Sequence, residues 1–245
     1  ASDVYKRQLQ GFELANRPVM DPLRLHLEAE AGRLAYRDRD RHIGDPAAAA
    51  IPVEELLSEA YAAELRRHIS PNRAMASLPD TPHAGRSDTV YLAVVDEDGN
   101  AISFINSLFG LFGAGVADST TGVIFQNRGS AFQVRTDHPN AIGPSKRAMH
   151  TIMPGMVTTD GQALMPFGVL GGHYPPFGHT HLESNGFDAG LDIQQASDAP
   201  RIFHFGGVLA LESGGPQGTA DALVARGHHV QPAYGPLGGG QAVMI

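Results

Sequence analysis

Two Asp-Gly pairs, each between two apolar runs, constrain the fold of this chain more than any other feature. An Asp-Gly pair adopts the left-handed backbone angles of a tight hairpin turn, so each pair predicts two antiparallel strands. Because the runs are apolar on both faces, we expect each sheet to be covered on both sides. The pairs with their flanking runs are Asp98-Gly99 between Val90–Val95 and Ala101–Ile105, and Asp160-Gly161 between Met156–Thr159 and Ala163–Leu170.

Helical patterns precede and follow these strands. Residues 24–69 carry apolar side chains at helical spacing, interrupted by the turn Gly44-Asp45-Pro46. Farther along, Asp192 followed three residues later by Gln195 is typical of a capping box, and residues 218–226 predict another helix. Helices, then strands, then a mixture of both fit a layered α+β sandwich better than alternating βαβ units.

Composition excludes several classes of function. The chain has 245 residues and no cysteine, which excludes disulfides, thiolate nucleophiles and cysteine-bound metals. Its formal net charge of −8 disfavours nucleic acids and anionic membrane surfaces as partners. No apolar stretch is long enough for a membrane span. The lack of cysteine is compatible with the cytoplasm and with the periplasm, so the compartment stays open.

Without cysteine, a nucleophile must be a serine, threonine, lysine, aspartate or glutamate, and no G-x-S-x-G or H-E-x-x-H motif occurs. Thr89 is the candidate because of its position. It opens the first strand run and follows a polar, proline-containing segment, residues 70–88, that is typical of an exposed linker. If the bond between Asp88 and Thr89 is cut, Thr89 gains an α-amine with a pKa of about 7.7–8.0. That amine can take the proton of the threonine hydroxyl, directly or through a water. The alternative is that Thr89 is only a good strand former.

Several segments, in order, resemble the γ-glutamyltranspeptidase family, over nearly the whole chain beyond about residue 9. The segments are Leu34–Arg41, Gly44–Pro46, Pro52-Val53, Leu56–Ser58, Tyr61–Glu64, Asp88–Asp96, Asp98–Asn100, Phe112–Gly115, Pro144–Arg147, Gly171-Gly172 and Asp198–Arg201. The first seven residues match no segment of the family. The resemblance implies the αββα four-layer sandwich of the N-terminal-nucleophile hydrolases, here incomplete.

The resemblance also implies how the chain is divided. Self-cleavage between Asp88 and Thr89 would make residues 1–88 the C-terminal part of a large-subunit region, ending in the linker. Residues 89–245 would be a small-subunit region that is truncated at its C-terminus, and the apolar end at residues 242–245 agrees with a strand that has no closing partner. We expect both regions to form one structural domain, and the two subunits to stay paired after the cut.

An acyl-enzyme mechanism without a cofactor follows from the resemblance. Thr89 would attack a γ-glutamyl or related acyl amide, and water or an amine acceptor would resolve the ester. Ser107 occupies the position of the hydroxyl that orients the nucleophile in the family; otherwise it is a surface serine. Gly171 and Gly172 would offer backbone N–H groups to the oxyanion, each worth about 2.7–4 kcal/mol in the transition state. Their alternative role is a plain turn at the end of a strand.

The substrate-binding positions depart from the family pattern. Phe109 stands in place of an asparagine, Asn127 is followed by Arg128 in place of a glutamine, and Ala131 replaces an aspartate. His150-Thr151 replaces a pair of serines. Ala131 cannot hold an α-ammonium group, and the cation of Arg128 favours an anionic or neutral acyl group, unless Arg128 is a loop residue in an ion pair. This pattern resembles the divergent branch of the family, which includes acylases that act on glutaryl amides.

Two further functions stay open at this point. A non-catalytic relative would use the fold as a binding or scaffold module. A metal hydrolase would use the histidine cluster, His173, His179 and His181, with Glu183 nearby. On one helix, residues 179 and 181 point about 200° apart, so we expect no metal site there. His150 or His173 is better suited to the wall of a pocket.

Overall fold

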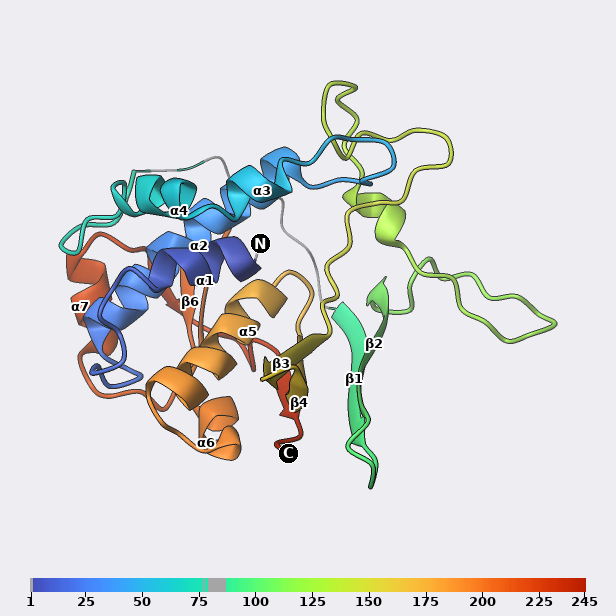
Figure 1. The fold of residues 1–245 in the computed structure, drawn as a ribbon. Coiled ribbons are helices and arrows are strands. Elements are labelled where there is room, and N and C mark those ends of the chain that lie inside the picture. The colour runs from blue at the N-terminus through green and yellow to red at the C-terminus, as the bar shows by residue number, and fades with distance from the viewer. Residues whose placement is uncertain (1, 77, 79–86) are drawn as a thin grey trace. The chain divides into compact units, whose positions relative to one another are not determined.

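The computed structural model describes residues 2–76, 78 and 87–245, which fold into two compact units whose segments alternate along the sequence (Figure 1). The first unit comprises residues 1–40, 52–83 and 176–237, and the second comprises residues 41–51, 84–175 and 238–245. Among the described residues, no helix has both the length and the apolar character needed to cross a membrane.

The second unit contains both predicted hairpins. Its strands are β1 (Ser87–Val95), β2 (Ala101–Gly110), β3 (Gly155–Thr159), β4 (Gln162–Leu170) and β8 (Gly239–Ala242). β1 pairs with β2 and β3 pairs with β4, both antiparallel and each across an Asp-Gly turn, as predicted. β8 joins the other edge of β4, so the unit holds a two-stranded sheet and a three-stranded sheet.

One face of the β1–β2 hairpin is exposed, so the expectation that both faces of each sheet are covered is wrong for the described chain. The exposed side chains are Val90, Leu92, Val94, Ile102 and Phe104. Tyr91 and Ile105, which point to the other face, are buried. The side chains of the hairpin therefore alternate between a buried and an exposed face, as the geometry of a strand dictates.

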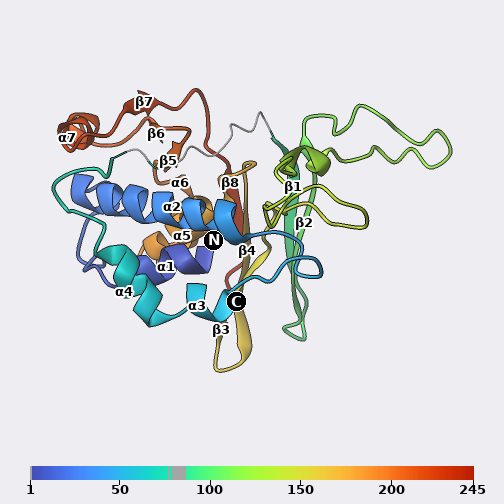
Figure 2. The same cartoon turned by 90° about the horizontal axis from the view of Figure 1, so that it is seen from above.

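The remaining helices and strands build mainly the first unit. They are α1 (Ser2–Leu9), α2 (Pro22–His42), α3 (Val53–Leu56), α4 (Glu59–Arg66), α5 (Pro175–Glu183), the π-helical turn η2 (Ser184–Asp188), α6 (Ile193–Asp198), α7 (Thr219–Ala225), β5 (Ile202–Phe205), β6 (Val208–Leu211) and β7 (Val230–Pro232). The strands form a sheet in the order β5-β6-β7. Figure 2 shows α1 beside α4. The predicted capping box starts α6: Asp192 and Gln195 bond each other's backbone N–H.

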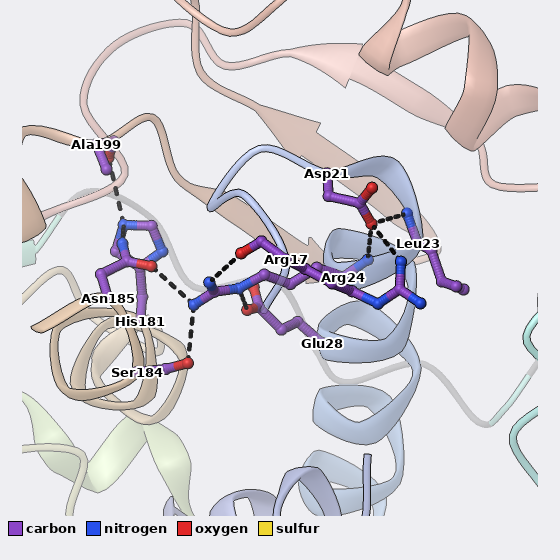
Figure 3. A network of polar contacts seen from close by, with 9 residues as sticks. All are labelled: Arg17, Asp21, Leu23, Arg24, Glu28, His181, Ser184, Asn185 and Ala199. Carbon is purple, nitrogen blue, oxygen red and sulfur yellow. Dashed lines mark hydrogen bonds and ion pairs between the residues drawn. The ribbon is translucent and has the colours of Figure 1, made fainter. Parts of the chain in front are cut away.

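A buried arginine of α2 forms an ion pair within the helix and connects it by hydrogen bonds to the turn after α5, within the first unit (Figure 3). Arg24 is 0% exposed, and its Nε donates to Glu28 Oε1 at 2.9 Å. Its Nη2 donates to Ser184 Oγ at 2.8 Å and to Asn185 Oδ1 at 2.9 Å. Burial raises the pKa of Glu28, against the attraction of Arg24. The charged groups of this pair are therefore held by a network that spans two distant parts of the sequence.

Three histidines meet in the first unit beside a cavity of about 230 Å³ that His204 and His228 line. His26 Nδ1 lies 2.7 Å from His228 Nε2, and His26 Nε2 lies 2.7 Å from the carbonyl oxygen of Ser70. The ring of His204 lies 6.4 Å from that of His228, centroid to centroid. Burial lowers the pKa of all three, to about 3 for His204 and about 4 for His228.

We expect the protein to lose stability as the pH falls from 7 towards 5. The folded-state pKa values of these histidines lie below the unfolded value of about 6.5. Their contribution is therefore complete above pH 6.5, and it is lost on acidification because the unfolded chain takes up protons that the folded chain refuses. Urea denaturation at several pH values measures the effect, and His228→Gln should give a shallower dependence. Equal slopes for wild type and variant would refute the assignment.

Candidate active site

The two predicted hydroxyl residues, Thr89 and Ser107, face each other across the β1–β2 hairpin. They are paired in the register, and Thr89 Oγ1 donates to Ser107 Oγ at 3.0 Å. Ser107 Oγ also accepts from the backbone N–H of Phe109 at 3.0 Å. Thr89 is the third residue of β1 and not the first, because the strand already begins at Ser87. The nucleophile candidate is thus held by a hydroxyl that is itself fixed to the backbone.

The register of the hairpin shifts at the predicted cleavage site. Asp88 pairs with Phe109 while Thr89 pairs with Ser107, which leaves Leu108 as the extra residue of a β-bulge. Phe109 has a φ of 76°, a left-handed conformation that is rare for a bulky side chain. Strain of this kind costs about 1–3 kcal/mol and persists only where the surrounding structure enforces it.

Asn127 enforces the conformation of this bulge. Its Oδ1 accepts from the N–H of Gly110 at 2.9 Å, and its own N–H donates to the carbonyl oxygen of Leu108 at 3.1 Å. Asn127, predicted to bind substrate, therefore contacts the backbone on both sides of Phe109. In this structure it acts on the shape of the strand that carries the site.

The buried face of the hairpin packs directly on β4. A Cβ on Gly168 would lie 2.3 Å from the ring of Tyr91, so only glycine allows this approach. One residue earlier in β4, the carbonyl oxygen of Phe167 accepts from Ser103 Oγ at 3.1 Å. Ser103 and Tyr91 also bond each other, Oγ to Oη, at 2.8 Å. A glycine inside an apolar strand indicates such a close approach, a signal that the sequence reading did not use.

Gly171 and Gly172 lie at the same end of the packed strands as Thr89. Their φ angles of 141° and 65° suit glycine. His173 follows them directly, and its ring packs edge-on against Phe109 with centroids 6.0 Å apart. Since Phe109 bonds Ser107, the partner of Thr89, this contact brings the two glycines to the nucleophile end of the hairpin.

One of the five residues predicted to bind substrate, Arg128, is a buried cation, and three of the other four lie around it. Arg128 is 5% exposed, its Nη1 donates to Thr151 Oγ1 at 2.9 Å, and its Cζ lies 5.3 Å from the ring centroid of Phe109. Burial lowers the pKa of Arg128. Burial, together with the charge of Arg128, lowers the pKa of His150. The structure thus gathers Phe109, Arg128, His150 and Thr151 next to the predicted catalytic pair.

Asn140 is a buried residue that no sequence motif indicated. Its Nδ2 donates to the carbonyl oxygen of Ala131 at 2.7 Å, and its Oδ1 accepts from the N–H of Met149 at 2.9 Å. Ala131 ends the short 3₁₀ helix η1 (Arg128–Ala131), and Met149 directly precedes His150. Asn140 therefore ties the segment of Arg128 to the segment of Thr151. No local pattern marks such a residue.

Asp45 and Arg147 form an ion pair that the sequence did not predict. Both lie in segments that resemble the family, but nothing in the sequence pairs them. Arg147 Nη2 lies 2.7 Å from Asp45 Oδ1, and the backbone N–H of Arg147 donates to Asp45 Oδ2 at 3.0 Å. These bonds to Arg147 hold the pKa of the Asp45 carboxyl well below its usual range. The pair anchors the start of the loop that carries His150 and Thr151.

The histidine cluster does not assemble in the described residues. His179 and His181 lie in α5 and are buried. His181 Nε2 lies 3.3 Å from the carbonyl oxygen of Ala199 and 3.0 Å from Asn185 Nδ2, so it serves a structural network. Within the part of the chain that the structure describes, no group of three histidine or acidic side chains could hold a metal ion.

Solved structures with this fold define the class of protein. A cephalosporin acylase from Bacillus halodurans superimposes with a TM-score of 0.90 at 38% identity, over 99% of this chain and 44% of that one. A γ-glutamyltranspeptidase from Pseudomonas nitroreducens, complexed with L-DON, gives a TM-score of 0.59 at 25% identity, over 63% of this chain and 88% of that one. The predicted α+β fold of the N-terminal-nucleophile hydrolases is confirmed, and the chain holds a part of it.

Sequence comparison then gives the family. The profile of γ-glutamyltranspeptidase matches residues 6–245. The glutathione hydrolase-like YwrD proenzyme of Bacillus subtilis (strain 168) is 40% identical over 176 residues, 72% of this chain and 33% of the relative. The acylase ACY 1 proenzyme of Pseudomonas sp. (strain V22) is 32% identical over 235 residues, 96% of this chain and 42% of the relative. The chain belongs to the γ-glutamyltranspeptidase family, and it spans less than half the length of these relatives.

Proposed function

We propose that the full-length protein is a self-processing amidohydrolase or acyltransferase that acts on γ-glutamyl or related acyl amides. The hydrogen bond between Thr89 and Ser107, placed at the bulge of the hairpin, is the observation that carries this proposal. The names of the relatives as proenzymes support it. In this proposal residues 1–88 belong to the large subunit and residues 89–245 to the small subunit, and the two stay paired after the cut.

The chemistry needs no cofactor. After the Asp88–Thr89 bond is cut, the α-amine of Thr89 accepts the proton of the threonine hydroxyl, and Oγ1 attacks the amide carbon. The carbonyl oxygen becomes an oxyanion, which backbone N–H groups at Gly171 and Gly172 stabilise. The same proton passes to the leaving nitrogen as the amide bond breaks. Water or an amine acceptor then attacks the ester and regenerates the free threonine.

Ser107 is a positioning residue in this mechanism. We expect Ser107→Ala to lower kcat by about 10- to 100-fold with little change in KM, because the Thr89 hydroxyl loses its hydrogen bond to Ser107 and samples unproductive rotamers. Ser107→Thr keeps the hydroxyl and should recover part of the activity. Steady-state kinetics with an anilide donor measure this effect, and an unchanged kcat would contradict the role.

A panel of acyl anilides tests the function. The full-length protein should release the aniline from γ-glutamyl or glutaryl p-nitroanilide, faster when an amine acceptor is added if transfer competes with hydrolysis. A processed protein that releases no aniline and forms no covalent adduct with an amide-mimicking electrophile would support the binding or scaffold alternative instead. The changed substrate pocket is the observation in favour of that alternative.

A further inference from the structure

The guanidinium of Arg128 is buried with unused hydrogen-bonding capacity. Nη1 bonds Thr151, but Nη2 is enclosed and has no hydrogen-bond partner among the described residues. No carboxylate in the described part of the chain lies within ion-pair distance of this side chain. Proteins rarely bury a charge without a partner, because the loss of hydration is then uncompensated. Such a group is explained by a ligand that completes it.

Several contacts fix the position of Arg128, so the side chain is not a loosely placed surface arginine. The backbone N–H of Arg128 donates to the side chain of Gln126. Asn140 holds the other end of η1 through Ala131. The ring of Phe109 covers the guanidinium in a cation–π contact of 5.3 Å. A preorganised guanidinium of this kind loses little entropy when it binds a carboxylate in a bidentate manner.

The buried guanidinium of Arg128 lies beside the residue that pairs with the proposed cleavage point. The backbone of Ser87 and Asp88 pairs with Gly110 and Phe109, and Phe109 is the residue whose ring covers Arg128. Cutting before Thr89 frees Ser87 and Asp88 from their covalent connection to the strand. The cut therefore removes a covalent constraint on the backbone that pairs with Phe109.

We propose that Arg128, assisted by Thr151, binds a carboxylate at the far end of the acyl group, so that the preferred donors are monoamides of dicarboxylic acids. This inference rests on the proposed function and narrows its substrate class. The position of Ala131 provides no anion for an α-ammonium group, and the charge of Arg128 repels one. A glutaryl group, which has the carboxylate and lacks the ammonium, therefore suits the site better than a γ-glutamyl group.

Three p-nitroanilides that differ only at the far end of the acyl group test the preference on the full-length, self-cleaved protein. Glutaryl carries a carboxylate, valeryl carries a methyl group in its place, and γ-glutamyl carries both carboxylate and ammonium. We expect kcat/KM for glutaryl to exceed that for valeryl by about 100-fold, because the valeryl donor leaves the buried guanidinium without a partner. We expect it to exceed that for γ-glutamyl by about tenfold.

Variants separate recognition from structure. Arg128→Met should lower kcat/KM for the glutaryl donor about 100-fold, mainly through KM. It should leave kcat/KM for the valeryl donor within about threefold of the wild-type value. Arg128→Lys keeps the charge but not the planar guanidinium, so its kcat/KM for the glutaryl donor should lie between those of the wild type and Arg128→Met. Arg135→Met is the matched control, because Arg135 is 70% exposed and pairs with Asp137 in the same unit. Arg135→Met should leave kcat/KM unchanged for both donors.

Binding without turnover distinguishes a failure of this inference from a failure of the proposed function. Isothermal titration of the full-length protein with glutarate should give saturable binding, and Arg128→Met should weaken this binding at least tenfold. Neutral valeramide should bind the wild type and the variant with equal affinity. Three results would each overturn the assignment. The first is equal kcat/KM for the glutaryl and valeryl donors, and the second is an equal loss of kcat/KM for all donors in Arg128→Met. The third is glutarate binding whose affinity is unchanged in Arg128→Met. A protein that binds glutarate through Arg128 yet hydrolyses no donor would support the carboxylate site and reject the hydrolase.

Discussion

Replacing Thr89 with alanine should leave the full-length chain uncut and lower amide hydrolysis by at least ~1000-fold, as removal of a nucleophile does in other acyl-transfer enzymes. The physical reason is that one side chain supplies the attacking oxygen for the cut and for the reaction that follows. Alanine also removes the donor to Ser107 but keeps the strand, because Thr89 is partly buried and paired through its backbone. A denaturing gel after long incubation and an anilide assay measure both effects.

Two controls make this result specific. Thr89→Ser keeps a hydroxyl at the same atom and should be cut, though more slowly, because serine fixes its χ1 angle less firmly than threonine. Thr158→Ala removes a threonine from the exposed side of β3 and should be cut at the wild-type rate. Cleavage of Thr89→Ala at a normal rate, with an unchanged melting temperature, would exclude Thr89 as the residue that performs the cut.

The second large effect concerns stability. Arg24→Met should lower the free energy of unfolding by about 3–5 kcal/mol, because it leaves the Glu28 carboxylate buried without its partner. Ser184 and Asn185 also lose the donor that holds the η2 turn to α2. Urea denaturation at neutral pH, with the slope of the transition compared between proteins, measures the change.

Removing both members of the pair tests this explanation. Arg24→Met combined with Glu28→Leu should recover most of the loss, since no charge then remains buried alone. Arg17→Met is the control, because Arg17 pairs with Asp21 near the surface at 3.5 Å and should cost less than about 1 kcal/mol. A cost below about 1 kcal/mol for Arg24→Met would show that water or another group compensates Glu28.

Local signals in the sequence predicted much of the fold. The Asp-Gly pairs indicated both hairpin turns, and the capping box of α6 depends on residues three apart. Asp160 and Gly161 are both left-handed in the second turn, whereas in the first turn Gly99 is left-handed and Asp98 is not. The prediction for the outer face of the β1–β2 hairpin was wrong, because an apolar strand has the same sequence pattern whether one face or both faces are covered. Val90 and Phe104 are exposed in the described chain.

In the candidate site, too, local contacts could be predicted from the sequence and contacts between distant segments could not. Thr89 and Ser107 are 18 residues apart on one hairpin, so a correct turn was sufficient to bring them together. Asn140 and the pair of Asp45 with Arg147 act through contacts between loops, which leave no periodic pattern in a single sequence. The enclosure of Arg128 also depends on three dimensions, because a basic residue in a loop is usually exposed.

The most direct measurement is the mass of the products that the wild-type full-length chain gives by itself and after reaction with an electrophilic amide analogue. We expect two polypeptides, the smaller one beginning with Thr89, and a single added group located on that N-terminal threonine. One uncut polypeptide, a new terminus elsewhere, or an adduct on a different residue would contradict it.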